Sequence, residues 1–182
     1  FPSRKIVVIA ITGTKGKSTT AEVVHRLFSA AGFKTALIST VEFRIGDTRE
    51  RNYFKMTTPG RFFLQRFLAR AVKEKCTHAV IEITSEAVLQ YRHRFLFLDA
   101  LIVTNGDDKG LQAFRDLPFI EQYQFRLSDM KPYYLTPEGT SFIWHNKMLK
   151  APFVGEFNLE NVMAALTLAD VYDLPEDAIR QS

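Results

Sequence analysis

The stretch at residues 13–18, Gly-Thr-Lys-Gly-Lys-Ser, has the residue types that bind phosphate groups in proteins. An apolar run at 6–11 precedes it and a helix-like pattern at 19–24 follows it, which predicts a turn between a strand and a helix. Such a turn directs several backbone N–H groups at one point and adds the positive end of the helix dipole. Lys17 adds a positive charge and Ser18 a hydroxyl group for Mg²⁺, so the stretch predicts a nucleoside triphosphate site. The alternative is a surface turn that binds no ligand.

The spacing of the glycines departs from the general phosphate-binding loop. That pattern, G-x-x-x-x-G-K-[ST], requires a glycine where this chain has Ile11. The first glycine here is Gly13, which gives a shorter loop. The dinucleotide-binding pattern G-x-G-x-x-G does not occur in this segment, so a dinucleotide fingerprint is excluded.

A single carboxylate, Glu82, stands near the end of the apolar run at 78–83. The ends of such strands are where ligands of open α/β sheets gather. A carboxylate in so apolar a strand is costly unless it is paired or bound to a metal. We therefore expect Glu82 to hold Mg²⁺ together with Ser18, with a salt bridge at the rim of the sheet as the alternative. The four histidines have no metal-ligand spacing and receive no chemical role.

Alternating strand and helix patterns must position these residues. Apolar strands are expected at 5–12, 35–40, 78–83 and 100–104, helices at 18–31, about 60–75 and 85–91, and a hairpin at 43–55 with its turn at Gly46-Asp47. The second half predicts short strands at 123–126, 133–137 and 141–145, then a helix from about 159 to 172. The expected fold class is α/β: a mostly parallel sheet that contains the phosphate loop, with helices on both faces, plus a small antiparallel β patch in the second half.

Length and composition limit the classes of protein. The chain has 182 residues, a net charge of +4 and one cysteine, so it is expected to be one domain without a disulfide scaffold, from a reducing compartment. No apolar run approaches the length of a membrane span. A basic cluster at 61–75 is most simply a solvated helix face, so we expect no nucleic acid partner, no membrane insertion and a cytoplasmic location.

Five motifs in a fixed order resemble those of a known family. They are the segments 11–20, 56–59, 81–86 with Gln90 and Arg92 beyond it, 104–105, and 155–161 followed by Ala164-Ala165. Together they resemble the central, ATP-binding domain of the Mur ligases, most closely the MurE type, which adds a diamino acid to UDP-N-acetylmuramoyl-dipeptide in peptidoglycan synthesis.

The resemblance implies a reaction and a set of residues. The family uses ATP and Mg²⁺ to convert the substrate carboxylate to an acyl phosphate, which the amine of the diamino acid then attacks. It implies catalytic roles for Lys17 and Glu82, with Ser18 and Glu82 as metal ligands. The implied ATP-binding residues are Gly13, Thr14, Lys15, Gly16, Lys17, Ser18, Thr19, Asn158 and Asn161. The implied contacts to the UDP-MurNAc-peptide are Thr57, Thr58, Ser85, Gln90 and Arg92.

Simpler roles compete with several of these assignments. Thr57 and Thr58 could cap the helix that follows Pro59, Ser85 could cap the next short helix, and Asn158 could cap the last one. Arg92 could be an ordinary surface arginine. The capping alternatives depend only on where each helix begins.

The chain also departs from the family pattern. The family continues after the position of Asn105 with a His- and Asp-rich segment and a lysine that becomes carbamylated, whereas here Gly106-Asp107-Asp108 follows directly. We expect that a loop, a helix and a strand are missing between Asn105 and Gly106. Glu86 stands where the MurE type often has histidine. Both chain ends read as cuts in a longer protein, without the family's N-terminal uridine-binding and C-terminal amino-acid-binding domains, so 1–182 is expected to be a monomeric central domain that binds nucleotide without turnover.

Three other functions remain open at this point. Folylpolyglutamate synthase has a similar fold and loop, but the motifs at 57–59 and 84–92 favour the muramoyl substrate. A non-catalytic ATP-binding module is disfavoured by Lys17 and Glu82. A general phosphate-loop kinase gives no reason for the motifs that follow Lys17.

Overall fold

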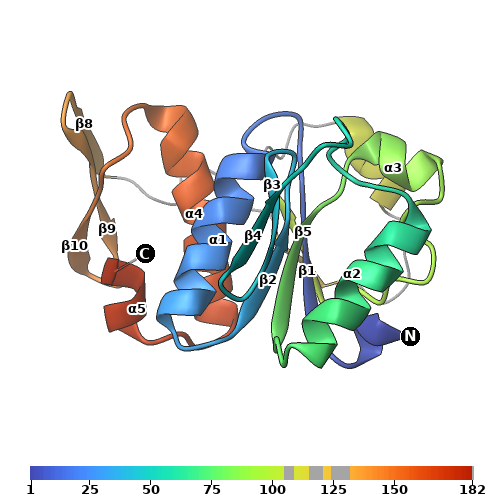
Figure 1. Ribbon diagram of the computed structural model, residues 1–182. Helices are drawn as coiled ribbons and strands as arrows, with labels where there is room; N and C mark the ends of the chain where they lie inside the picture. The colour runs from blue at the N-terminus through green and yellow to red at the C-terminus, as the bar shows by residue number, and fades with distance from the viewer. Residues whose placement is uncertain (105–108, 115–120, 124–131, 182) are drawn as a thin grey trace.

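The computed structural model describes residues 1–104, 109–114, 121–123 and 132–181, and its centre is a seven-stranded sheet (Figure 1). The strand order is β4-β3-β2-β5-β1-β6-β7. Five neighbouring strands are parallel: β2 (Thr35–Ile38), β5 (His78–Glu82), β1 (Val7–Thr12), β6 (Ala100–Val103) and β7 (Glu121–Tyr123). The hairpin of β3 (Glu42–Ile45) and β4 (Thr48–Arg51) extends the sheet antiparallel to β2, with its turn at Gly46-Asp47 as predicted.

The central strands are apolar throughout because both of their faces are covered. In β1, Val8 and Ala10 belong to the core on one face, and Ile9 and Ile11 belong to the core on the other. All four side chains are fully buried. This pattern is the one expected for a parallel sheet between two helix layers.

The helices form those two layers (Figure 1). On one side lie α1 (Lys17–Ala30), α4 (Glu156–Val171) and α5 (Glu176–Gln181), and on the other lie α2 (Arg61–Lys73) and α3 (Ser85–Leu89). Two short 3₁₀ helices, η1 (Pro2–Arg4) and η2 (Lys109–Phe114), complete the described helices. The α/β fold class, with helices on both faces of a mostly parallel sheet, is confirmed.

A separate three-stranded antiparallel sheet packs against α4. Its strands are β8 (Tyr133–Thr136), β9 (Gly139–Trp144) and β10 (Lys147–Ala151), in the order β10-β9-β8. Phe142 and Leu149 form a small core with Leu159, Val162 and Leu166 of α4. The predicted antiparallel patch therefore exists and serves as a cover for this helix.

Three predicted details in the second half are wrong. The strand expected at 123–126 overlaps β7 at Tyr123, and β7 pairs parallel with β6 in the main sheet instead of joining the antiparallel patch. Residues 124–126 of that prediction lie outside the described residues. Strand β10 was missed because its two lysines mask the one buried position, Leu149. Helix α4 begins at Glu156 rather than near 159, since Gly155 with φ +94° is its N-cap.

The predicted break between Asn105 and Gly106 falls outside the residues that the structure describes. Across the described ranges, no helix is long and apolar enough to cross a membrane.

Candidate functional site

The phosphate loop, residues 13–18, joins the end of β1 to the start of α1. Gly16 is the N-cap of α1 in the left-handed conformation, with φ +82°. Thr104, directly after β6, fixes the loop, since its hydroxyl lies 2.6 Å from the carbonyl oxygen of Lys15 and 3.0 Å from that of Thr12 and can donate its one proton to either. The loop is thus fixed by the sheet itself, and residue 104 belongs to one of the predicted motifs.

The open end of the loop presents hydrogen-bond donors. The first N–H groups of α1 have no acceptor within the helix, and they carry the positive end of its dipole. The Lys17 ammonium lies over the loop and donates to the carbonyls of Gly13 at 2.6 Å and Thr14 at 3.2 Å. Backbone donors and one positive charge therefore converge at the same point, as phosphate binding requires.

Helix α4 supports the loop through Asn161. The Asn161 side chain is 1% exposed, and its Oδ1 accepts a hydrogen bond from the Thr20 hydroxyl at 3.0 Å. A Cβ atom on Gly16 would lie 2.1 Å from that Oδ1, far inside van der Waals contact. Position 16 therefore requires glycine for two reasons, its positive φ and this close approach.

The two asparagines predicted at the ATP site differ in their surroundings. Asn161 lies directly against the phosphate loop, and its Nδ2 has no hydrogen-bond partner among the described residues. Asn158 lies one turn earlier, and its Nδ2 donates to the carbonyl of Val154 at 2.9 Å. The capping alternative for Asn158 is wrong, because Gly155 is the N-cap of α4.

Glu82 meets the loop at the carboxyl edge of the sheet. Its backbone pairs with Ile11 of β1, and its side chain is fully buried. One carboxylate oxygen accepts from the Ser18 hydroxyl at 3.1 Å and from the Thr40 hydroxyl at 3.1 Å, and the other accepts from the Thr40 N–H at 3.0 Å. Burial raises the pKa of Glu82, and the hydrogen bonds from Thr40 and Ser18 and the charge of Lys17 only partly oppose it.

The surroundings of Glu82 fit a divalent cation. No lysine or arginine in the described ranges forms an ion pair with this carboxylate, so the salt-bridge alternative is wrong for that part of the chain. The Ser18 hydroxyl and the Glu82 carboxylate are oxygen ligands of the kind that Mg²⁺ prefers, at the mouth of the loop. No cluster of three or more His, Cys, Asp or Glu that could hold a metal occurs among the described residues. A cation here would therefore depend on oxygens that a nucleotide or water supplies.

Threonines continue the site along this edge. The Thr40 hydroxyl lies 2.9 Å from the Thr57 hydroxyl, so a chain of three hydrogen bonds through Thr40 and Glu82 connects Thr57 to Ser18. Thr58 is 1% exposed, donates to the Glu82 carbonyl at 2.9 Å and accepts from the Thr84 N–H at 3.2 Å. Thr58 thus ties two loops together in this structure, and a substrate contact for it stays a prediction.

The helix-capping alternatives for these threonines and for Ser85 are also wrong. Helix α2 begins at Arg61 with Gly60 as its N-cap and no side-chain cap. Helix α3 is capped by Thr84, whose side chain accepts from the Ala87 N–H at 3.1 Å. Ser85 is therefore left without a capping role, half-buried beside the site.

Arg92 and Gln90 lie next to Thr58 rather than in isolation on the surface. Arg92 donates to the Thr58 carbonyl at 2.7 Å and to the Gln90 side-chain oxygen at 2.5 Å. The Gln90 amide in turn donates to Glu86 at 2.8 Å. The structure thus brings the predicted substrate residues Thr57, Gln90 and Arg92 to the same end of the sheet as Glu82.

Sequence reasoning missed two residues of this arrangement. Thr40 makes two of the three hydrogen bonds to Glu82, and Thr20 connects α1 to Asn161. Thr40 carries a weak signal, because it directly follows an apolar strand at the carboxyl edge. Thr20 lies within the motif at 11–20, but its pairing with Asn161 carries no local signal, since that partner lies 141 positions away.

Comparison with known proteins places this geometry in a family. The family model described as the Mur ligase middle domain matches residues 11–136. The "UDP-N-acetylmuramoyl-L-alanyl-D-glutamate--2,6-diaminopimelate ligase" of Chlamydia felis is 28% identical over 215 residues, which cover 92% of this chain and 43% of that protein. The "UDP-N-acetylmuramyl-tripeptide synthetase" of Treponema pallidum is 40% identical over 127 residues, which cover 69% of this chain and 23% of that protein. The chain spans less than half the length of these relatives.

Solved structures show the same fold. A UDP-N-acetylmuramoyl-L-alanyl-D-glutamate--2,6-diaminopimelate ligase matches with a TM-score of 0.71 at 20% identity, covering 96% of this chain and 45% of that one. The folylpolyglutamate synthetase from Lactobacillus casei matches with a TM-score of 0.63 at 14% identity, covering 99% of this chain and 62% of that one. At these identities, the structural likeness concerns the fold alone.

Proposed function

Because the chain belongs to the Mur ligase family, whose middle-domain model matches residues 11–136, we propose that it is the ATP-binding part of a peptidoglycan-precursor ligase. The proposed reaction joins a diamino acid to UDP-MurNAc-dipeptide, as the name of the Chlamydia felis ligase indicates for that protein. One observation carries the proposal: the Ser18 hydroxyl of the phosphate loop donates a hydrogen bond of 3.1 Å to the carboxylate of the buried Glu82, at the carboxyl edge of the sheet. Activation of a carboxylate by ATP needs phosphate binding and charge neutralisation at one point.

In this proposal, the loop positions the phosphate groups of ATP. The N–H groups at the start of α1 bind phosphate oxygens, and Lys17 neutralises charge on the terminal phosphates. Asn161 keeps Gly16 in place from behind, so its contribution to nucleotide binding includes positioning of the loop. Asn158 is half-buried on α4 with its Nδ2 bound to the Val154 carbonyl, and its side-chain oxygen is the group we assign to the adenine end.

Ser18 and Glu82 are the residues that would hold Mg²⁺. The cation would neutralise charge on the phosphate groups during transfer. Its presence would also offset the cost of the buried Glu82 carboxylate, which has no ion-pair partner in the described ranges. Thr40 keeps this carboxylate oriented toward Ser18 through its two hydrogen bonds.

The carboxyl-edge surface next to Glu82 is the proposed place for the muramoyl-peptide. Thr57 lies beside Thr40, and Arg92 presents a guanidinium group held in place by the Thr58 carbonyl and Gln90. A fixed guanidinium group can orient an anionic substrate group through paired hydrogen bonds. Ser85 lies at the start of α3, beside the same edge.

We also propose that this chain lacks an internal segment that its relatives have. The match to the Chlamydia felis ligase extends over 215 positions but covers 92% of this chain, about 167 residues. The relative thus has about 48 more positions within the matched region. The match to the Cytophaga hutchinsonii ligase, 91 residues over half of this chain, needs no such insertion. These lengths support a missing internal segment, and its location after Asn105 is proposed from the order of the sequence motifs.

The cellular setting follows from the proposed substrates. A ligase that consumes ATP and a UDP-linked precursor works where both are made, so we propose a cytoplasmic enzyme. We further propose that it acts as a monomer, without nucleic acid as a partner.

The test is a comparison of two acceptor substrates by isothermal titration. The protein is first saturated with Mg²⁺ and a non-hydrolysable ATP analogue, and then titrated with UDP-MurNAc-dipeptide or with folylglutamate. We expect binding of the muramoyl compound, and Arg92→Gln to weaken it about tenfold, as the loss of a charge-assisted contact predicts. Arg94→Gln, two positions away and exposed, is the matched control and should leave the affinity unchanged. Preferential binding of folylglutamate, or equal effects of the two variants, would overturn the substrate assignment.

A further inference from the structure

Helix α1 and the hairpin of β3 and β4 line an open, polar cavity whose walls include none of the loop residues 13–18. Its volume is about 800 Å³, which is in the range of small-molecule sites. A second cavity of about 400 Å³ shares several lining residues with it and extends to Ser18. We call the larger cavity the α1–hairpin groove, defined by Glu22, His25, Arg26, Lys34, Arg44 and Arg49.

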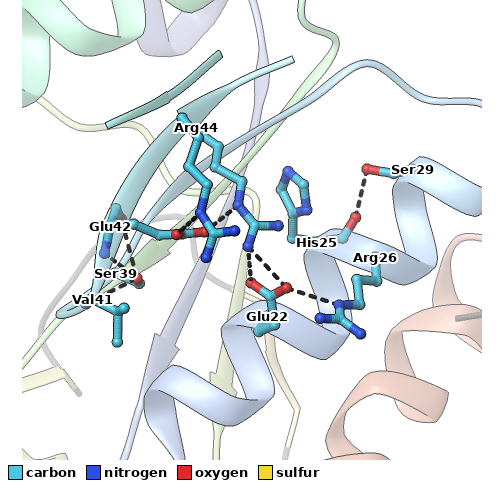
Figure 2. Close-up of polar contacts among 9 residues, drawn as sticks. Glu22, His25, Arg26, Ser29, Ser39, Val41, Glu42 and Arg44 are labelled. Carbon is cyan, nitrogen blue, oxygen red and sulfur yellow. Dashed lines mark hydrogen bonds and ion pairs between the residues drawn. The ribbon is translucent and has the colours of Figure 1, made fainter. Parts of the chain in front are cut away.

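Two carboxylates orient three arginines in this groove. Figure 2 shows Glu22 between Arg26 and Arg44, with nitrogen–oxygen distances of 2.8 Å to Arg26 and 3.0 Å to Arg44. Glu42, only 4% exposed, forms ion pairs with both Arg44 and Arg49. Burial alone would raise the pKa of Glu22, but the hydrogen bonds and charges of Arg26 and Arg44 outweigh it and lower the pKa. The arginines are therefore held in place before any ligand arrives.

The arginines keep donors that the carboxylates do not use. The ion pairs involve Nε of Arg26, Arg44 and Arg49 and one Nη of Arg44. No described residue accepts a hydrogen bond from Nη1 of any of the three. Lys34 adds an ammonium group with no ion pair in the described ranges. The four cations exceed the carboxylates Glu22, Glu42 and Asp47 by one charge.

His25 gives the groove a buried polar group. Its side chain is 7% exposed, and neither ring nitrogen meets the geometry of a hydrogen bond with a described residue, although the Thr35 backbone lies close enough to act on its pKa. Figure 2 shows the His25 imidazole extending from α1 beside Arg44. Burial lowers the pKa of His25, the charge of Arg44 adds to this, and the opposing effects of Glu22, the Thr35 backbone and Glu42 are smaller. The neutral ring thus offers one N–H donor and one acceptor to the groove.

We propose that the α1–hairpin groove binds a small oxyanion with two or more negative charges, separately from the nucleotide site. Guanidinium forks match the paired oxygens of phosphate and carboxylate groups, and these forks are already oriented by Glu22 and Glu42. The buried His25 ring adds a neutral polar group to the lining of the same groove. The phosphate loop uses backbone donors at the N-terminus of α1, whereas the α1–hairpin groove uses side chains along the side of this helix.

The test is isothermal titration with inorganic phosphate and, separately, malonate, in a Lys17→Ala background that removes the loop's charge. The variant Arg26→Gln/Arg49→Gln removes two exposed guanidinium groups, whose side chains are 60% and 65% exposed. We expect a loss of affinity of about tenfold or more. The matched control is Arg66→Gln/Arg70→Gln on α2, which removes the same charge from exposed positions outside the groove and should have no effect. Binding of phosphate alone, or of malonate alone, identifies the kind of oxyanion.

Imidazole NMR provides a second measurement that does not depend on these variants. The ring-nitrogen resonances of His25, assigned with His25→Gln, should shift on addition of the bound anion, while those of His145 should not. No binding of either anion, equal losses in the two double variants, or an unchanged His25 resonance at saturation would each overturn the proposal.

Discussion

Helix α1 borders two polar sites that are built in different ways. The phosphate loop at its N-terminus is one contiguous segment, and its donors are mainly backbone N–H groups whose positions depend on glycine conformation. The α1–hairpin groove along its flank consists of side chains from α1, β3, β4 and the residues before β2. A site made of backbone groups tolerates few changes of residue at its glycines. A site made of side chains should instead lose affinity gradually, as its side chains are replaced one after another.

The largest effect is expected from Gly16→Ala in the loop. The alanine would have to adopt φ +82°, and its Cβ would lie 2.1 Å from Oδ1 of Asn161. We expect the free energy of unfolding to fall by about 2–4 kcal/mol, as strain and a steric clash combine. Thermal and urea unfolding, each followed by circular dichroism, measure this change.

A matched glycine separates the two causes. Gly32 also has a positive φ, +87°, but no atom lies within 4 Å of its missing Cβ. Gly32→Ala should therefore cost only the conformational strain, about 1–2 kcal/mol. Adding Asn161→Ala to Gly16→Ala should recover part of the loss, although Thr20 then loses its acceptor. Equal effects of the two glycine variants, or no recovery in the double variant, would show that the close approach of Asn161 does not constrain the loop.

A smaller, pH-dependent effect is expected at Glu82. Because its pKa is raised in the folded state, the folded protein binds the proton more readily than the unfolded chain does. The native protein thus gains stability as the pH falls through that raised value toward the ordinary 4.5, and it loses this stability as the pH rises.

Glu82→Gln removes this dependence. Its stability relative to the native protein should be highest at about pH 8 and should decrease as the pH is lowered. Urea unfolding across this pH range measures the difference, and Glu86→Gln, exposed on α3, is the control that should show none. A difference that grows as the pH falls would mean that Glu82 is stabilised in its charged form by a partner that the described residues do not include.

The same contrast explains what the sequence could and could not predict. The loop, the apolar strands and Glu82 at a strand end are local patterns, so their elements and their common edge were predictable. The pairing of Thr20 with Asn161 and of Thr40 with Glu82 depends on how distant segments pack. The groove was not predicted, because Glu22, Arg44 and Arg49 look like ordinary surface charges until α1 and the hairpin are placed side by side.

Helix starts show a similar limit. Thr58, Ser85 and Asn158 are all residue types that cap helices, yet the caps are Gly60, Thr84 and Gly155. The choice of cap depends on the backbone conformation at each entry point, which the tertiary structure sets. Thr58, Ser85 and Asn158 do not cap these helices, and their polar side chains lie near the candidate site instead.

The most direct test of the central claim is titration of Mg²⁺ with a non-hydrolysable ATP analogue into three proteins: the native chain, Lys17→Ala and Lys15→Ala. Lys15 is exposed, and its contribution to the loop is its backbone carbonyl, which Thr104 binds and which alanine retains. We predict that Lys17→Ala weakens nucleotide binding by about 100-fold, the size of two lost charge-assisted contacts. Lys15→Ala should leave the affinity within about threefold of the native value. Equal affinities of the native chain and Lys17→Ala would contradict the assignment of residues 13–18 as the nucleotide site.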